Sequence, residues 1–108
     1  MLKKCSLKYF EAFSNKDLDL IGGMLSSNAC LRDWDISEKG KKGVLHAMHN
    51  IFNSVETIKV TVLNMYREEY SVVAELDILI NDHELIKVVD ILQFNKSNKI
   101  MNIRAFKG

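Results

Sequence analysis

Two carboxylates in this sequence stand among apolar neighbours, where an ionised side chain is costly. Asp33 lies in the stretch CLRDWDIS, which otherwise resembles a short buried strand, and Asp90 lies in KVVDILQF. A carboxylate that enters a core costs several kcal/mol unless it is paired with a cation or protonated. Burial also raises the pKa of a carboxyl group toward neutral pH. Both residues are therefore candidates for acid–base chemistry.

A tyrosine can supply the third group of such a site. Tyr9 falls on the apolar stripe of a helical pattern, so its hydroxyl is expected to point into the same interior as the carboxyls. Asp90 shares its side of a predicted strand with Val88 and Leu92, which directs it inward. If the groups converge, Asp33 can remove a proton next to a carbonyl group, while Tyr9 and protonated Asp90 stabilise the enolate.

Each of these residues also has an ordinary structural interpretation. Asp90 could be a buried acid that is hydrogen-bonded to Tyr9 or to a backbone amide, with no catalytic role. Asp33 could line a polar pocket in which nothing is turned over, and Tyr9 could be a core residue. Trp34, the single tryptophan, is expected to pack in the core or to form a wall of the pocket. The sequence leaves these alternatives open.

Other titratable residues are weaker candidates. His46 and His49 are three residues apart on a predicted helix, but no third ligand stands at a fixed spacing, so we expect no metal site. Glu75, Asp77 and Arg104 alternate along predicted strands. We expect them to pair across the outer face of a sheet rather than to line a pocket.

Composition limits the classes of function. The chain has 108 residues, of which 47% are hydrophobic and 27% charged, as expected of a single globular domain over residues 1–108. A net charge of +1 gives no reason to expect nucleic acid or a membrane surface as a partner. The two cysteines, Cys5 and Cys30, lack metal-ligand spacing, so we expect free thiols and a cytoplasmic location. No stretch approaches the roughly 20 apolar residues of a membrane span.

Hydrophobic periodicity predicts the elements that must position the candidate residues. A helical period predicts three helices, over residues 2–15, 17–25 and 44–52. A short strand that contains Asp33 and a loop over residues 37–43 separate the second helix from the third. The period then changes to two and predicts four strands, over residues 56–66, 71–80, 84–94 and 100–106. This ααβαββββ order predicts an α+β domain in which three helices pack in the concave face of a curved antiparallel sheet.

One predicted strand is apolar on both of its sides. In ELIKVVDILQF, the inward residues alternate with Val89 and Ile91, which face the other way. A strand of this kind needs cover on both faces, and in a domain this small a second subunit can supply it. We therefore expect a homodimer that forms through the outer face of the sheet.

The order of elements and several stretches resemble the nuclear transport factor 2-like superfamily, which includes bacterial ketosteroid isomerases and SnoaL-like polyketide cyclases. The resemblance is carried by KYFEAFSNKDLDLI, ACLRD, VVDILQF and KIMNIRAFKG, and it covers almost the whole chain. It implies a cone-shaped fold around a pocket for a small hydrophobic ligand, with no cofactor. This superfamily hosts both enzymes and non-catalytic domains.

The isomerase pattern also implies roles for three residues. Tyr9 takes the place of the tyrosine that donates to the substrate oxyanion, Asp33 that of the general base, and Asp90 that of the protonated acid that completes the oxyanion hole. Ketosteroid isomerase is a known example of a carboxylic acid that an apolar site keeps neutral. Trp34 stands where isomerases usually have a proline, and Met48 stands where a second tyrosine usually supports the first.

Apolar and aromatic residues are expected to line the ligand pocket. They are Phe13, Trp34, Met48, Val88, Leu92 and Ile103. Two functions remain open: a cofactor-independent isomerase, cyclase or dehydratase that acts next to a carbonyl group, and a non-catalytic ligand-binding or dimerisation module. An open cavity in which the three polar groups converge favours the enzyme, whereas a cavity closed by Met48, Trp34 and phenylalanine residues favours the module.

Overall fold

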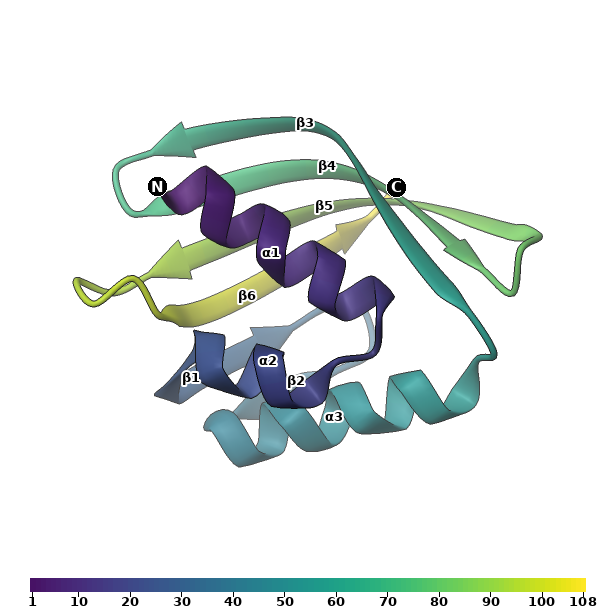
Figure 1. The fold of residues 1–108 in the computed structure, drawn as a ribbon, viewed down its shortest axis with the longest axis horizontal. Helices are drawn as coiled ribbons and strands as arrows, with labels where there is room; N and C mark the ends of the chain where they lie inside the picture. Colours follow the sequence, from purple (N-terminus) through teal and green to yellow (C-terminus); the bar gives the residue numbers. More distant parts are fainter.

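The helices lie mostly in the first half of the chain and the long strands in the second (Figure 1). The computed structural model describes all residues from Met1 to Gly108. The elements are α1 (Leu2–Ser14), α2 (Leu18–Met24), β1 (Leu25–Arg32), β2 (Ser37–Lys39), α3 (Lys41–Ser54), β3 (Ile58–Glu68), β4 (Ser71–Ile80), β5 (Glu84–Phe94) and β6 (Ile100–Lys107). No helix is both long enough and apolar enough to cross a membrane.

Six strands form one sheet in the order β2-β1-β6-β5-β4-β3. The last four strands are an antiparallel meander, as predicted, but β1 runs parallel to β6. The sheet is therefore mixed rather than purely antiparallel. The first and last strands of the chain meet at this pairing, and their relative direction depends on the whole path between them. Register breaks in β3 and β6 are bulges of the kind that bend strands.

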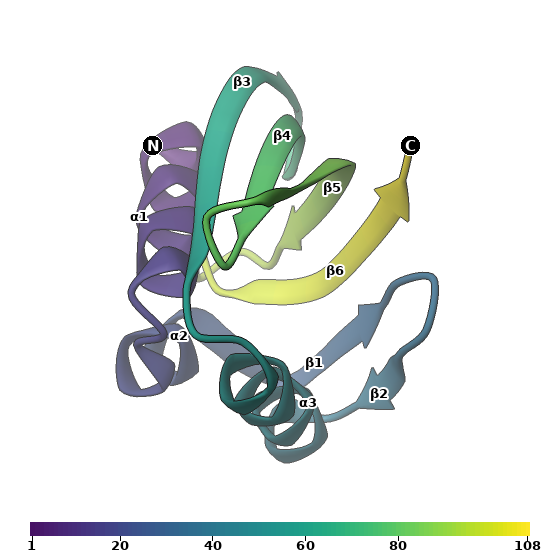
Figure 2. The ribbon, with the colours of Figure 1, turned by 90° about the vertical axis from the view of Figure 1, so that its right-hand side faces the viewer.

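The helices lie on the concave face of the curved sheet (Figure 2). Helix α1 packs against β3 and β4, whereas α3 packs against β1 and β2. Helix α2 begins at Asp17, whose side chain accepts a hydrogen bond from the Leu20 N–H at 3.1 Å. It packs against α3 where Gly22 approaches Leu45, since a Cβ atom on Gly22 would lie 3.4 Å from the Leu45 side chain. The predicted α+β fold class with three helices and a cone-like shape is confirmed.

The segment around Asp33 differs from the prediction. The expected loop contains the short strand β2, which pairs antiparallel with the end of β1. Asp33 consequently lies in the turn between these strands and not within a strand. Its Oδ1 atom accepts hydrogen bonds from the N–H groups of Asp35 at 2.7 Å and Ile36 at 2.6 Å. This side-chain turn ends β1 and reverses the chain.

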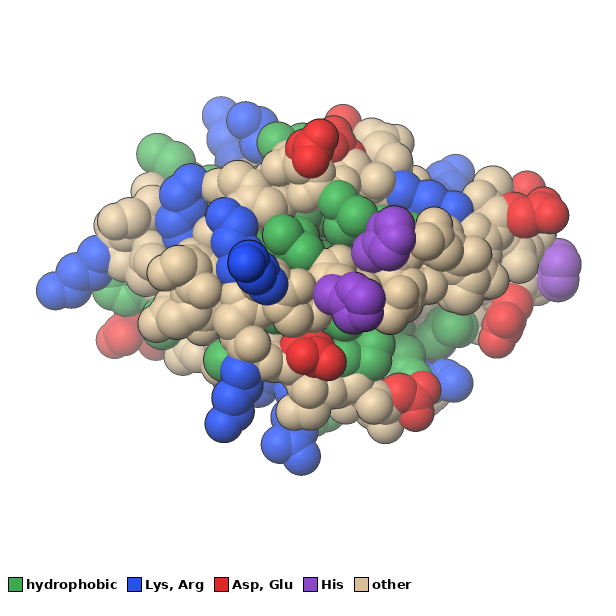
Figure 3. Space-filling model, turned by 90° about the horizontal axis from the view of Figure 1, so that it is seen from below, with side chains coloured by type: hydrophobic (Ala, Val, Ile, Leu, Met, Phe, Trp, Pro, Cys, Tyr) green, Lys and Arg blue, Asp and Glu red, His purple; other side chains and the backbone are tan.

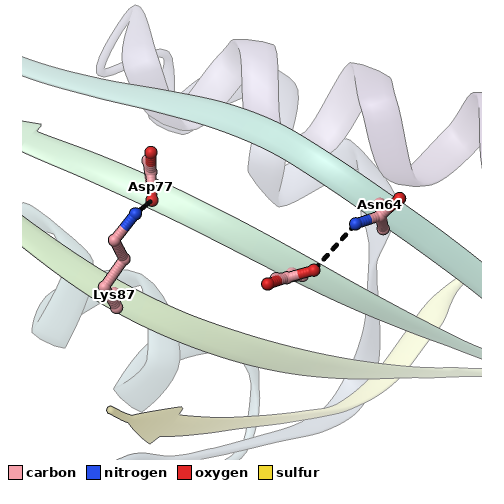
Figure 4. A network of polar contacts seen from close by, with 4 residues as sticks. Asn64, Asp77 and Lys87 are labelled. Carbon is pink, nitrogen blue, oxygen red and sulfur yellow. Dashed lines mark hydrogen bonds and ion pairs between the residues drawn. The ribbon is translucent and has the colours of Figure 1, made fainter.

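The outer face of the sheet carries the charged residues that alternate with inward apolar ones. Lys87 forms an ion pair with Asp77 at 2.6 Å, and Asn64 donates a hydrogen bond to Glu75 at 2.8 Å (Figure 4). Neither acid lines the apolar cavity on the inner side of the sheet. Glu75 and Asp77 thus lie outside the cavity, as expected, but only Asp77 forms an ion pair, and Arg104 forms none.

Candidate active site

An apolar cavity of about 230 Å³ lies between the helices and the concave face of the sheet. Twenty residues line it, and 17 of them are hydrophobic. The other three are Asp33, Asp35 and Asp90. A cavity that is mostly apolar and contains a few converging polar groups is the usual form of a small-molecule site.

The structure brings Tyr9, Asp33 and Asp90 to this one cavity. Tyr9, from α1, is 2% exposed, and Asp90, from the inner side of β5, is 8% exposed. The partners of Asp90 in register are Ala74 on β4 and Ala105 on β6. These short side chains leave open space beside the carboxyl group, and Ala105 itself lines the cavity.

The two buried polar groups open onto the cavity. The structure shows no hydrogen bond from the Asp90 carboxyl group or the Tyr9 hydroxyl to any other group of the protein. At the same time, no fully enclosed side-chain nitrogen or oxygen atom lacks a partner. The oxygen atoms of Tyr9 and Asp90 must therefore reach the cavity, where a ligand can bind them.

Burial controls the ionisation of both groups. Burial, together with the nearby charge of Asp33, raises the pKa of Asp90 from 3.8 to about 7. Burial, together with the charge of Asp90, raises the pKa of Tyr9 well above its ordinary range. Tyr9 is thus a neutral hydroxyl donor, and Asp90 keeps its proton to a much higher pH than an ordinary aspartic acid. This direction agrees with the expectation for Asp90.

The turn holds the Asp33 side chain in one orientation. The backbone N–H groups of Asp35 and Ile36 both donate to the same atom of this side chain, Oδ1. The second carboxylate oxygen has no partner in the protein and is free to accept a proton. Asp33 is half-buried, which leaves it more accessible than Asp90.

Five of the six predicted pocket residues line the cavity. Phe13, Met48, Val88 and Ile103 do so from α1, α3, β5 and β6, and Trp34 does so while 45% exposed. The sixth, Leu92, is completely buried in the core and does not line it. Leu92 is two residues past Asp90 on the same side of β5. The alternation of side chains along the strand indicates that Leu92 points inward, but it does not indicate how far the cavity extends along β5.

Several lining residues were not predicted. They are Phe10, Leu31, Asp35, Ile36, Ile51, Ile58, Val60, Leu76, Ile78, Ile80, Ile86 and Ala105. Strand alternation carried a signal for some of them, because Leu76 and Ile78 share the inner side of β4 with Ala74, the partner of Asp90. No comparable signal marked Asp35, since its position depends on the turn.

The remaining candidates lie elsewhere. His46 and His49 are exposed on α3, and His49 Nε2 is 2.9 Å from the side-chain nitrogen of Asn53. The underside of the molecule shows histidine, basic and acidic side chains around small apolar areas (Figure 3). The structure contains no group of three or more histidine, cysteine or acidic residues arranged to hold a metal ion. Cys5 and Cys30 are half-buried free thiols.

Comparison with known proteins supports the fold. No family model matches the sequence, and no curated protein matches it. Among solved structures, an NTF2-like protein of unknown function from Cytophaga hutchinsonii aligns with a TM-score of 0.84 and 16% identity, over 100% of this chain and 90% of that one.

Two further structures are named for activities. A protein from Shewanella denitrificans named as a SnoaL-like polyketide cyclase aligns with a TM-score of 0.86 and 12% identity, over 99% of this chain and 90% of that one. The epoxide hydrolase/cyclase-like enzyme SalBIII, which has a role in pyran ring formation in the polyether salinomycin, aligns with a TM-score of 0.85 and 20% identity, over 99% and 90%. At these identities the likeness shows the fold alone: the chain has the nuclear transport factor 2-like fold.

Proposed function

We propose that the cavity carries out cofactor-independent acid–base chemistry on a small hydrophobic carbonyl compound, as an isomerase, cyclase or dehydratase. The observation that carries this proposal is the meeting of Tyr9, Asp33 and Asp90 in one apolar cavity. The names of the structural neighbours are compatible with it, since a protein named as a SnoaL-like polyketide cyclase and an epoxide hydrolase/cyclase-like enzyme share the fold.

The chemistry follows from the positions of the three groups. Asp33 removes a proton from the carbon next to the carbonyl group, and the electron pair of that C–H bond forms the enolate. The hydroxyl of Tyr9 and the protonated carboxyl of Asp90 donate hydrogen bonds to the enolate oxygen. Asp33 then returns the proton to another carbon or to a leaving group. Negative charge moves from Asp33 to the ligand, so the total charge of the apolar cavity stays constant.

The size of the cavity limits the ligand. An engineered cavity of about 150 Å³ holds one benzene molecule. The volume here, about 230 Å³, therefore suits a compound of about one or two rings. The apolar walls favour a hydrocarbon skeleton with one carbonyl group.

A second candidate is a ligand-binding module without turnover. It is favoured by the turn between β1 and β2, because the hydrogen bonds that Asp33 accepts from Asp35 and Ile36 give this carboxylate a structural role. The two candidates differ in whether Asp33 exchanges a proton with the ligand.

Binding of 4-nitrophenol tests the proposed oxyanion site. This phenol resembles an enol, and its phenolate absorbs at longer wavelength. In Asp33→Asn, the neutral amide imitates Asp33 after it has accepted the proton. We therefore expect the variant to bind the phenolate at least about ten-fold more tightly than the wild type, which is about 1.4 kcal/mol of binding free energy. Absorbance titration measures this. Weaker or unchanged phenolate binding would contradict an oxyanion site beside Asp33.

We also propose that the chain forms a homodimer through the outer face of the sheet. Val89, which is 36% exposed, lies directly opposite Phe106, which is 57% exposed. Beside this pair, Val73 lies between Ile91 on β5 and Tyr66 on β3. These five residues form an apolar outer face that spans the four meander strands, and a second copy can cover it.

Replacing Phe106 by Glu is expected to give a monomer, because a charge within the buried face would be desolvated without a partner. Light scattering at about 50 µM should find twice the 12.4 kDa of one chain for the wild type and the mass of one chain for the variant. Leu20→Glu is a matched control, since Leu20 on α2 is 47% exposed and far from this face. A monomeric wild type, or a dimeric Phe106→Glu variant, would rule the interface out.

A further inference from the structure

The charged groups of the cavity are all acids. The turn between β1 and β2 contributes Asp33 and Asp35, and β5 contributes Asp90. The only polar group that helix α1 contributes is the hydroxyl of Tyr9. The lining residues from α3, β3, β4 and β6 are all apolar. No lysine, arginine or histidine lines the cavity. The acid–base reaction uses Asp33 as the ionised base and Asp90 only in its protonated form, so it gives no role to the ionised form of Asp90.

Among these acids, the buried carboxyl group of Asp90 gives the strongest indication that the cavity can bind a cation. Asp90 is more than nine-tenths buried, faces the cavity and forms no hydrogen bond or ion pair within the protein. When Asp90 is ionised, its charge is buried without a counter-ion, which is unfavourable by several kcal/mol. A cation placed in the cavity would interact with Asp90 and Asp33 together.

The walls of the cavity also suit a cation that carries an apolar group. Four aromatic residues line it: Tyr9, Phe10, Phe13 and Trp34. The faces of aromatic rings attract ammonium groups. The molecule already contains one such contact, because the Lys107 ammonium lies 5.8 Å from the centre of the Trp34 ring.

We propose that the ionised form of this cavity binds small hydrophobic ammonium ions, with Asp90 and Asp33 as counter-ions and the aromatic residues as walls. This inference goes beyond the proposed function and does not rest on it, because the carbonyl reaction uses the protonated form of Asp90. Hydrophobic amines are then ligands of the same cavity that compete with carbonyl compounds, and pH decides which of the two binds.

Charge selection is the first consequence. Benzylamine, benzyl alcohol and benzoate share one aromatic ring and differ in charge. At pH 8, where benzylamine is still protonated, we expect it to bind at least about ten-fold more tightly than benzyl alcohol, because a close charge pair with little solvent contributes more than a neutral hydrogen bond. Benzoate should show no binding, since Asp33 and Asp35 repel it.

The pH dependence is the second consequence. The pKa of Asp90 is about 7, so below that pH an ammonium ion must displace a proton from Asp90. If only the ionised form binds, benzylamine should bind about thirty-fold more weakly at pH 5.5 than at pH 8. At pH 6, nearly one proton should be released for each benzylamine bound.

Isothermal titration calorimetry in two buffers of different ionisation enthalpy measures affinity and proton release together. Asp90→Asn should lose most of the preference for benzylamine over benzyl alcohol and all of the thirty-fold pH dependence. Asp33→Asn should lose part of the preference, so the test does not depend on a single variant. Asp82→Asn is the matched control, because Asp82 is an exposed turn residue with φ 62°, a conformation that asparagine tolerates.

Three results would overturn the inference. One is benzyl alcohol binding as tightly as benzylamine at pH 8, which would show that the cavity selects neutral ligands. Another is the absence of any benzylamine binding at millimolar concentration. The third is unchanged benzylamine binding and proton release in Asp90→Asn. None of these results tests proton abstraction from a ketone, which is measured separately. The two proposals can therefore fail independently.

Discussion

The Asp33→Asn variant is expected to lose proton abstraction almost completely while it keeps its fold. Asparagine retains the oxygen that accepts hydrogen bonds from the backbone of Asp35 and Ile36, so the turn between β1 and β2 persists. The amide cannot take a proton from carbon. A positioned general base contributes typically about 10² to 10⁴ in rate, and we expect a loss in this range.

Exchange of hydrogen for deuterium next to a carbonyl group measures this step without knowledge of the natural substrate. Small cyclic ketones, such as cyclohexanone and 2-tetralone, are incubated with the protein in deuterated water, and NMR follows the loss of the proton signal. The matched control is Asp82→Asn. Asp82 is an exposed turn residue with φ 62°, a conformation that asparagine tolerates, and it does not line the cavity.

The control should exchange at the rate of the wild type. If Asp33→Asn exchanges as fast as Asp82→Asn, Asp33 is not the base. If no ketone exchanges faster with the wild-type protein than without it, the acid–base function is wrong for this substrate class, and the ligand-binding module becomes the better interpretation.

The long elements of this fold could be predicted because their hydrophobic period extends over many residues. The prediction for residues 84–94 has the same bounds as β5, and that for residues 71–80 has the same bounds as β4. Strand β2 has three residues, which is too short for a period to be detected. The parallel pairing of β1 with β6 has no local sequence signal, because it joins segments about 75 residues apart.

The site could be predicted only in part, for a similar reason. Alternation along β5 was sufficient to place Asp90 on the inner side, and helical period was sufficient for Tyr9. Neither pattern indicates where a core ends and a cavity begins, which is why Leu92 was placed in the pocket. The turn around Asp33 depends on side-chain hydrogen bonds to the backbone. Such bonds are local, but the sequence around Asp33 is compatible with either a strand or a turn, so it does not decide between them.

The Asp90→Asn variant is expected to be more stable than the wild type above pH 7. The pKa of Asp90 is 3.8 in the unfolded reference and about 7 in the folded protein. Between these values the folded protein binds more protons than the unfolded chain, so the free energy of unfolding falls as the pH rises from about 4 to about 7. A difference of about three pKa units corresponds to about 4 kcal/mol, which is the order of magnitude of the loss. Asparagine does not ionise, so the variant does not lose this stability as the pH rises.

Denaturant unfolding at pH 4.5 and pH 8.5 measures this difference. Near pH 4.5 the variant should be more stable by only about 1 kcal/mol, because Asp90 is still protonated in the folded protein and only the unfolded chain has begun to ionise. At pH 8.5 the variant should be more stable by up to about 4 kcal/mol, with the same m value. Asp82→Asn, which changes an exposed carboxylate, should follow the wild type at both pH values. An Asp90→Asn effect that is the same at both pH values would mean that Asp90 stays ionised in the folded protein, and it would remove the donor on which the oxyanion site depends.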